Sequence, residues 1–183
     1  MKATKATKKA NFVLGQISRS FSYRDRCTFI KLYKTFVRPH LEYASQVWSP
    51  WTKKDRDMLE NVQKRAVRMV AGLSGSYEEK LAACGLTTLE ERRLRGDIIQ
   101  TFKFVNNLNS VSHPFLSFVA NQHSYTTRTS SELCQGLTST PSKLNCRHNF
   151  FSKRICGPWN SLPTTVKGAK SVNEFKNAYD SLS

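Results

Sequence analysis

Acidic residues are scarce in this sequence. Its 183 residues include 13 Asp and Glu against 29 Lys and Arg, which gives a formal net charge of +16. Such an excess indicates a polyanionic partner: RNA, DNA or an anionic membrane surface. No run of 18 apolar residues is present, so we expect no membrane span and no membrane partner. The basic residues 1–10 also lack the apolar block of a secretion signal.

The cysteines form neither a disulfide framework nor a metal motif. Their number is odd and their spacing irregular, which favours reduced thiols in a nuclear or cytoplasmic protein; they are Cys27, Cys84, Cys134, Cys146 and Cys156. Structural zinc needs closely paired ligands such as Cys-x2-Cys, whereas the nearest set, Cys134, Cys146, His148 and Cys156, has gaps of eleven, one and seven residues. We expect no metal and no cofactor.

Motifs of independent catalysis are missing as well. The sequence has no Gly-x-Ser-x-Gly nucleophile motif. It also has no glycine-rich loop that could cradle a phosphate. An enzyme acting on its own is therefore not expected.

The first half of the chain shows helical periodicity. Apolar residues recur at helical spacing in 11–21 and again in a segment that starts near Ser22 or Asp25. Pro39 lacks an amide donor and disfavours helix at the residue before it, so a break or kink is predicted there. The repeat KATKATKK within 1–10 fits either a disordered arm or the tail of a helix.

Later helices carry clear start and stop signals. One is predicted from a Thr52 cap to Gly72, and a short one over about 77–84. Thr88 and Glu91 form a capping box for a helix over about 89–108. Its apolar face is expected to comprise Leu94, Ile98, Phe102 and Val105.

The last third changes character. Residues 109–147 are rich in Ser, Thr, Asn and Gln, which predicts a long polar loop. Residues 149–160 are predicted to be helical until Gly157-Pro158, and a final helix follows a Ser171 cap.

Together these patterns predict an all-α fold. We expect a helical bundle, which the resemblance described below implies is thumb-like, followed by further helices and an irregular polar segment. The expected divisions are a basic arm at 1–10, the bundle at 11–72, a helical extension at 73–108, the polar loop at 109–147 and a C-terminal helical segment at 148–183.

Five segments resemble one protein family, and they occur in the family's order over nearly the whole chain. Residues 32–50, LYKTFVRPHLEYASQVWSP, resemble the region just after the polymerase palm in reverse transcriptases of LINE-type (non-LTR) retrotransposons. Residues 9–21 and 57–66 (DMLENVQKRA) are similar to the start and the long helix of its thumb. Residues 85–97 and 150–163 resemble the blocks that follow.

The resemblance implies descent from an RNA-directed DNA polymerase, in which thumb helices close on the template–primer duplex. Catalysis in that family needs two metal ions held by palm aspartates, including an adjacent Asp-Asp pair. None of the aspartates here matches that motif: they are Asp25, Asp55, Asp57, Asp97 and Asp180. The chain is expected to begin after the palm and to lack the endonuclease. The resemblance therefore implies a non-catalytic fragment, with a palm-containing polymerase region as a possible partner.

The helix predicted at 52–72 carries the main candidate site. At 100° per residue its apolar side chains share one face, and the cations lie broadly opposite with Asp57 among them. This arc fits either phosphate contact or an ordinary solvated face; the resemblance favours contact. The candidate contacts are Arg19, Arg38, Lys53, Lys54, Lys64, Arg65 and Arg68.

Two further ambiguities concern Arg38 and the aromatic residues. Arg38 fits a phosphate contact and a helix-end charge partner equally well. Aromatic rings beside basic residues can stack on bases. However, Tyr33 and Phe36 lie on an apolar helix face and are predicted in the core, as are the more open Trp48 and Trp51.

The function we expect is sequence-tolerant binding of RNA or an RNA–DNA duplex through backbone phosphates. Two alternatives stay open: a translated remnant of a truncated element without present function, and a protein-interaction module reused by its host. In the parent enzyme a thumb would rest on the palm, so we expect exposed apolar side chains near Phe12, Trp48 or Phe151.

Overall fold

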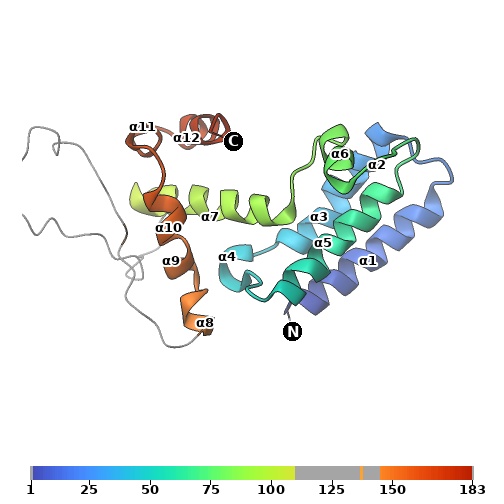
Figure 1. Cartoon of the computed structure of the whole chain (residues 1–183), viewed down its shortest axis with the longest axis horizontal. Coiled ribbons are helices and arrows are strands. Elements are labelled where there is room, and N and C mark those ends of the chain that lie inside the picture. The colour runs from blue at the N-terminus through green and yellow to red at the C-terminus, as the bar shows by residue number, and fades with distance from the viewer. Residues whose placement is uncertain (1, 110–136, 138–144, 183) are drawn as a thin grey trace, which may run out of the picture. The chain divides into compact units, whose positions relative to one another are not determined.

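The chain folds into helices joined by turns and short loops (Figure 1). The computed structural model describes residues 2–109, Leu137 and residues 145–182. All the regular elements among these residues are helices, which confirms the all-α class. The chain divides into two compact units, the first ending at Leu94 and the second starting at Arg95, and each has its own hydrophobic core.

Helix α1 is longer than the sequence periodicity predicted. It spans Lys2–Ser20, so the basic repeat belongs to a helix and the disordered-arm alternative is wrong. Its buried face is Ala3, Ala10, Leu14 and Ile17. The alanines of the repeat therefore continue the apolar stripe toward the N-terminus, and their small size kept them out of a pattern based on large apolar residues.

The next helical stretch passes through Pro39 without the predicted break. Helix α2 (Arg26–Leu32) is capped by Asp25, whose carboxylate accepts from the Thr28 N–H at 2.9 Å. A π-helical segment, η1 (Tyr33–Val37), leads directly into α3 (Arg38–Glu42). In η1 the Arg38 N–H reaches back to the Tyr33 carbonyl. This wider turn shifts the hydrogen-bonding register just before Pro39, so that the missing donor does not end the helix.

The π-helical segment also changes which aromatic ring is buried. Tyr33 and Val37 are fully buried, whereas the Phe36 side chain is 53% exposed. The core prediction is correct for Tyr33 and wrong for Phe36. Its physical cause is the extra residue in the wide turn, which rotates Phe36 off the face predicted at α-helical spacing.

The first unit is completed by three more helices. They are α4 (Ser45–Trp48), α5 (Lys53–Arg68) and α6 (Tyr77–Ala83). The Thr52 hydroxyl accepts from the Asp55 N–H at 3.1 Å, which confirms the predicted cap of α5. Figure 1 shows α5 beside α1, and both pack on one core that also receives Leu81 and Leu86 from around α6. This core crosses the division predicted at residue 72.

Helix α7 (Leu89–Val105) begins in the first unit and continues into the second. The predicted capping box is confirmed: the Thr88 N–H donates to Glu91 at 3.0 Å and the Glu91 N–H to Thr88 at 3.2 Å. Ile98 and Phe102 are buried as expected, while Leu94 is 39% exposed.

The rest of the second unit consists of short helices. They are α8 (Asn145–His148), α9 (Phe151–Arg154), α10 (Cys156–Asn160), α11 (Thr164–Lys167) and α12 (Val172–Asp180). The predicted stop at Gly157-Pro158 is wrong, because both residues lie in the first turn of α10, where a proline needs no amide donor. The Ser171 cap of α12 is confirmed by its 3.2 Å bond from the Glu174 N–H.

The second core is aromatic. Phe175 is fully buried, and its ring stacks on Phe102 with centroids 4.2 Å apart. Phe151 is also buried, so the predicted exposed patch is wrong there: the neighbouring Phe150 is the exposed ring. Phe12 is 63% exposed, as predicted. Most of the polar loop predicted at 109–147 lies outside the described residues.

Candidate nucleic-acid interface

Helix α5 has one buried side and one basic side. Its buried side chains are Leu59, Val62, Gln63, Ala66 and Val67. On the other side Lys53, Lys54, Arg65 and Arg68 are exposed and Lys64 is half-buried. We call these five residues the basic face of α5. The structure thus brings together on one helix surface five of the seven predicted contacts, with Asp57 exposed among them.

The described ion pairs use other arginines. Arg56 pairs with Glu90 at 2.8 Å, Arg95 with Asp180 at 2.6 Å and Arg154 with Asp97 at 2.9 Å; Arg92 pairs with Glu42. Over residues 2–109 and 145–182, no cation of the basic face has an acidic partner within salt-bridge distance. The charge of this face is therefore left uncompensated by ion pairs within the described residues.

Two cations of the basic face contact uncharged side chains. The Lys64 ammonium lies 5.2 Å from the centroid of the Tyr77 ring. Arg65 donates from Nη1 to Asn11 Oδ1 of α1 at 3.3 Å. Neither contact removes charge, because an aromatic ring and an amide only orient the cation. The neighbours therefore orient these two side chains on the basic face.

The start of α5 carries a local electrostatic cost. Lys53 and Lys54 occupy the first turn, where the helix macrodipole is positive and cations are disfavoured by roughly 0.3–1 kcal/mol each. Asp55 in the same turn offsets part of this cost. An anion bound at this end would meet both lysines and the positive end of the helix.

The two remaining predicted contacts lie apart from α5. Arg19 is exposed in the last turn of α1. Arg38 is half-buried, with its Nε 3.7 Å from Glu42, the carboxylate that Arg92 also holds. Burial, and next the Arg92 charge, lower the pKa of Arg38. Arg38 therefore has a structural partner, but that partner is the Glu42 carboxylate and not a helix end as predicted.

A buried polar network holds α5 in place beneath its basic face. The Tyr33 hydroxyl donates to Gln63 Oε1 at 2.7 Å, and Gln63 Nε2 donates to the Thr87 carbonyl at 2.9 Å. Glu60 accepts from the Leu89 N–H at 3.0 Å and from the Tyr77 hydroxyl. Burial raises the pKa of Tyr33, which keeps the phenol a neutral donor. The network links α5 to η1, α6 and the start of α7.

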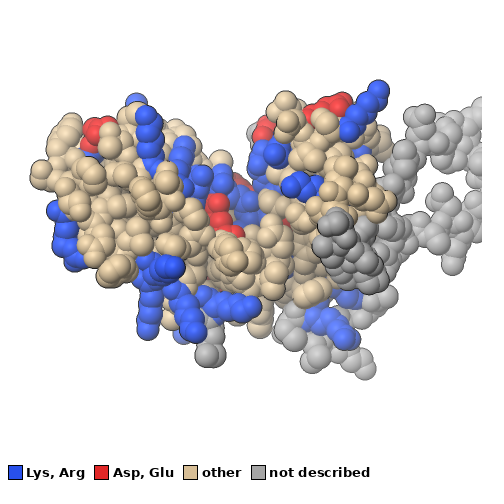
Figure 2. Space-filling model, turned by 180° about the vertical axis from the view of Figure 1, so that it is seen from behind, with Lys and Arg blue, Asp and Glu red and all other residues tan. Residues whose placement is uncertain are grey.

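Cations also gather outside α5. Figure 2 shows Lys and Arg side chains concentrated along the lower edge of the first unit. Helix α1 contributes the exposed Lys2, Lys5, Lys8 and Lys9. Sequence reasoning placed these residues in an arm and missed them as candidate contacts. Their 3- and 4-residue spacing was the available signal, since it sets Lys2, Lys5 and Lys9 along one stripe once the repeat is helical.

The aromatic predictions in this unit have mixed outcomes. Trp51 is 48% exposed, so its prediction as a core residue is wrong. Trp48 is half-buried and packs against the edge of the first core. Tyr43 is 80% exposed. Tyr43 and Trp48 line the same pocket as Lys2, Lys5 and Lys9 of α1.

Most aspartates have evident structural partners. Asp25 caps α2, and Asp55 accepts from the Thr52 hydroxyl at 2.9 Å. Asp97 and Asp180 pair with arginines of the second unit. Within the described residues no group of three or more His, Cys, Asp or Glu could hold a metal ion. No described helix combines the length and the apolar character needed to cross a bilayer.

Comparison with known proteins gives one distant relative. An uncharacterized protein of Caenorhabditis elegans is 28% identical over 104 residues, which cover 55% of this chain and 50% of that protein. The chain thus spans about half the length of this relative. No family model and no solved structure matches the chain.

Proposed function

We propose that the first unit is a nucleic-acid-binding module that holds RNA or an RNA–DNA duplex through backbone phosphates. Its central contacts are Lys53, Lys54, Arg65 and Arg68, with Lys64 at the edge, and Arg19 of α1 is a further contact apart from α5. The observation that carries the proposal is that the basic face of α5 has no acidic partner among the described residues, whereas Arg56, Arg92, Arg95 and Arg154 each pair with a carboxylate.

Phosphate binding gives a physical reason for surface cations without acidic partners. A cation already paired with a carboxylate would have to break that pair before it could bind a phosphate. An unpaired cation at the surface binds a phosphate directly and releases a counterion from the nucleic acid. Such contacts fix the position of a duplex without reading its sequence. Arg38 shares Glu42 with Arg92 and is therefore left out of the proposed interface.

The proposal also includes that this module belongs to a larger protein. The five sequence blocks support a thumb-like role in a non-LTR retrotransposon reverse transcriptase, beside a palm-containing polymerase region. Such a protein would act in the nucleus or the cytoplasm. The block 57–66 coincides with the centre of α5, so the resemblance and the unpaired cations point to the same helix.

We also propose that the chain itself is not catalytic. Two-metal phosphoryl transfer requires carboxylates that converge on the ions. Most of the aspartates here instead take part in helix caps or pair with arginines, as Asp25 and Asp97 illustrate. A chain of this kind would bind the nucleic acid, while a separate region catalyses the reaction.

Salt titration tests the proposal. Four exposed cations that each neutralise one phosphate predict a slope of about −4 in log K against log salt, or roughly a hundredfold weaker binding from ~50 to ~200 mM. The measurement is fluorescence anisotropy with a labelled RNA–DNA duplex. Neutralising Lys54 and Arg68 to Gln should reduce the slope by about 2.

The matched control neutralises two other exposed cations of the same unit, Arg26 and Lys31, and therefore makes the same change in net charge. It should leave the slope almost unchanged. An equal effect of both double variants would show that only net charge matters and would reject the interface. Binding to a protein partner without salt-sensitive duplex affinity would instead support the interaction-module alternative, and a chain that never unfolds cooperatively would support the remnant.

A further inference from the structure

A groove lies beside the N-terminal half of α1. It has a volume of about 680 Å³ and is formed by α1, α3 and α4 with the turn between the last two. That volume lies within the range of about 300–1,000 Å³ that is usual for small-ligand sites. Its lining residues are Lys2, Lys5, Ala6, Lys9, Pro39, His40, Tyr43, Ala44, Val47 and Trp48.

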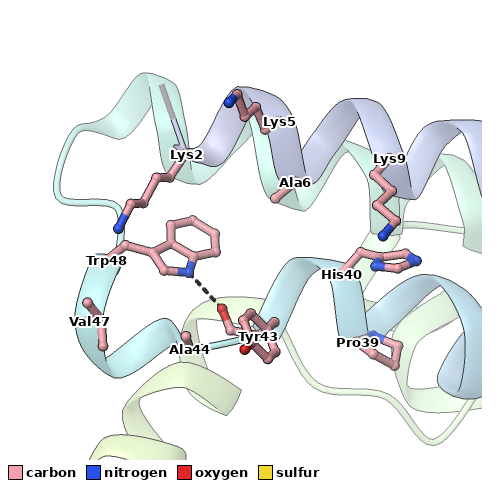
Figure 3. Close-up of a pocket in the computed structure, with 10 residues that line it drawn as sticks. All are labelled: Lys2, Lys5, Ala6, Lys9, Pro39, His40, Tyr43, Ala44, Val47 and Trp48. Atoms are coloured by element: carbon pink, nitrogen blue, oxygen red, sulfur yellow. Dashed lines mark hydrogen bonds between the residues drawn. The ribbon is translucent and has the colours of Figure 1, made fainter.

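The groove combines an apolar floor with a cationic rim. Ala6, Pro39 and Val47 provide apolar surface, and the three lysines of α1 line one side. None of the ten lining residues is acidic. Figure 3 shows Lys2 and Lys9 extending from α1 toward Trp48 and His40, with Lys5 on the outer side of the helix. At 1.5 Å per residue these lysines extend over about 10 Å of α1.

Two aromatic side chains stand on the opposite side. The Trp48 indole N–H donates to the Tyr43 carbonyl at 2.6 Å, which satisfies the ring nitrogen and fixes the indole. The Tyr43 side chain itself is 80% exposed. Val47, which also lines the groove, is 67% exposed. Neighbouring exposed apolar side chains of this kind usually mark a contact surface.

The backbone at the groove is strained. Ala44, between Tyr43 and α4, has φ of 53° in the left-handed region, which costs a residue with a Cβ roughly 1–2 kcal/mol. Such conformations persist where surrounding structure imposes them, and they cluster at functional sites. Here the left-handed residue turns the chain so that Tyr43 and Trp48 flank the same groove (Figure 3).

We propose that this groove binds an unpaired nucleotide, with its base against Tyr43 and Trp48 and its phosphates on Lys2 and Lys9. The inference rests on the proposed function and extends it from the duplex to an adjoining single strand. Aromatic rings beside a line of cations are the usual combination for single-stranded nucleic acid. The absence of acidic lining residues favours an anionic ligand. The aromatic rings of Tyr43 and Trp48 favour a ligand with a flat face, such as a base.

The test compares three labelled probes on the full chain at one salt concentration. They are a blunt RNA–DNA duplex, the same duplex with a four-nucleotide single-stranded extension, and that single strand alone. Stacking of one base predicts about tenfold tighter binding of the extended duplex than of the blunt one. Tyr43→Ala should remove this advantage and leave blunt-duplex binding unchanged, whereas Tyr43→Phe should keep it.

The lysines provide a second, independent readout. Changing Lys2 and Lys9 to Gln should lower the salt slope for the extended duplex by about 2 and leave the slope for the blunt duplex unchanged. Because Tyr43 and both lysines are exposed, these variants should unfold at the wild-type temperature, which circular dichroism can verify.

Each outcome separates the two proposals. Salt-sensitive blunt binding with no advantage for the extension overturns the nucleotide site and leaves the duplex interface standing. Tyr43-dependent binding of the single strand without any duplex binding overturns the duplex interface and leaves the nucleotide site standing. Binding of neither nucleic acid overturns both. If a Glu- and Leu-rich peptide, rather than the oligonucleotide, binds in a Tyr43-dependent way, the groove accepts a protein segment and the nucleotide assignment is wrong.

Discussion

At the scale of single residues, Gln63 is the most consequential polar side chain of the first unit. It is fully buried in the middle of α5, yet both ends of its amide have partners. A buried polar group costs little while it is hydrogen-bonded and much when it loses its partner. Gln63 therefore determines how α5 is fixed against Tyr33 and Thr87, and so where the basic face points.

Replacing Gln63 with Leu should destabilise the first unit by about 2 kcal/mol, because the Tyr33 hydroxyl and the Thr87 carbonyl lose a buried partner. Adding Tyr33→Phe to that variant removes the orphaned hydroxyl and should recover about 1 kcal/mol. Tyr33→Phe alone should destabilise, since it leaves Gln63 Oε1 without its donor. Urea unfolding followed by circular dichroism measures all three. A double variant less stable than Gln63→Leu alone would contradict this account.

No sequence pattern pointed to this network. Gln63 stands in a helix among charged and apolar residues, and nothing in its local context distinguishes it from a surface glutamine. Its burial depends on Tyr33, thirty positions earlier along the chain, and on a carbonyl beyond α6. Partners of that kind become visible only when the helices are packed.

At the scale of the helix, the two ends of α5 make opposite contributions to stability. Lys53 and Lys54 oppose the helix macrodipole at its start, while Arg65 and Arg68 favour it at its end. If phosphate binding requires cations along the whole face, the lysines at the start are retained against local stability. Departures of this kind from local rules are expected at functional sites.

Charge reversal separates the two contributions. Lys54→Glu should stabilise the unit by about 0.5–1 kcal/mol, because an anion suits the helix start, and Arg68→Glu should destabilise it by a similar amount. Both variants should weaken duplex binding. Unfolding midpoints and duplex anisotropy, measured on the same preparations at low salt, give both quantities. Parallel shifts in stability would contradict the macrodipole argument, and unchanged duplex affinity in Lys54→Glu would contradict its role as a phosphate contact.

Helix boundaries followed the sequence closely where a cap signals them. Thr52, Thr88 and Ser171 each accept the expected backbone N–H, and Asp25, one of the two predicted helix starts, does so as well. These signals are local: a short polar side chain satisfies a donor three residues further on. The basic face of α5 was predictable for a similar reason, since a regular helix between known ends fixes which side chains share a side.

Predictions failed where geometry departs from the ideal helix or depends on packing. The wide turn of η1 rotated Phe36 outward, and no composition rule identifies a π-helical segment. Phe150 and Phe151 are adjacent and chemically identical, so only the second core decides which one is buried. The groove beside α1 was invisible for the same reason, because it requires Lys2 and Lys9 to lie next to Tyr43.

At the scale of the whole molecule, the chain has two hydrophobic cores, one in each unit. All the proposed contacts lie in the first unit. The second unit has its own ion pairs, and Arg95 reaches across that unit from α7 to Asp180 at the end of α12 in a two-pronged contact of 2.6 Å each. Stability of the second unit should therefore respond to this pair without changing the interface.

The Arg95–Asp180 pair predicts a pH dependence of definite sign. The Arg95 hydrogen bonds hold the pKa of Asp180 below its usual value, so the pair stabilises the fold above the unfolded-state pKa of about 3.9, and its contribution is lost as pH falls through the lower folded-state pKa. Because both side chains are partly exposed, a double-mutant cycle with Arg95→Gln and Asp180→Asn should give a coupling of about 0.2–1 kcal/mol at pH 7. That coupling should vanish in strong acid, and duplex affinity should stay at the wild-type value in all three variants. Urea unfolding across pH measures the coupling, and a value that stays constant into strong acid would show that the carboxylate charge is not its source.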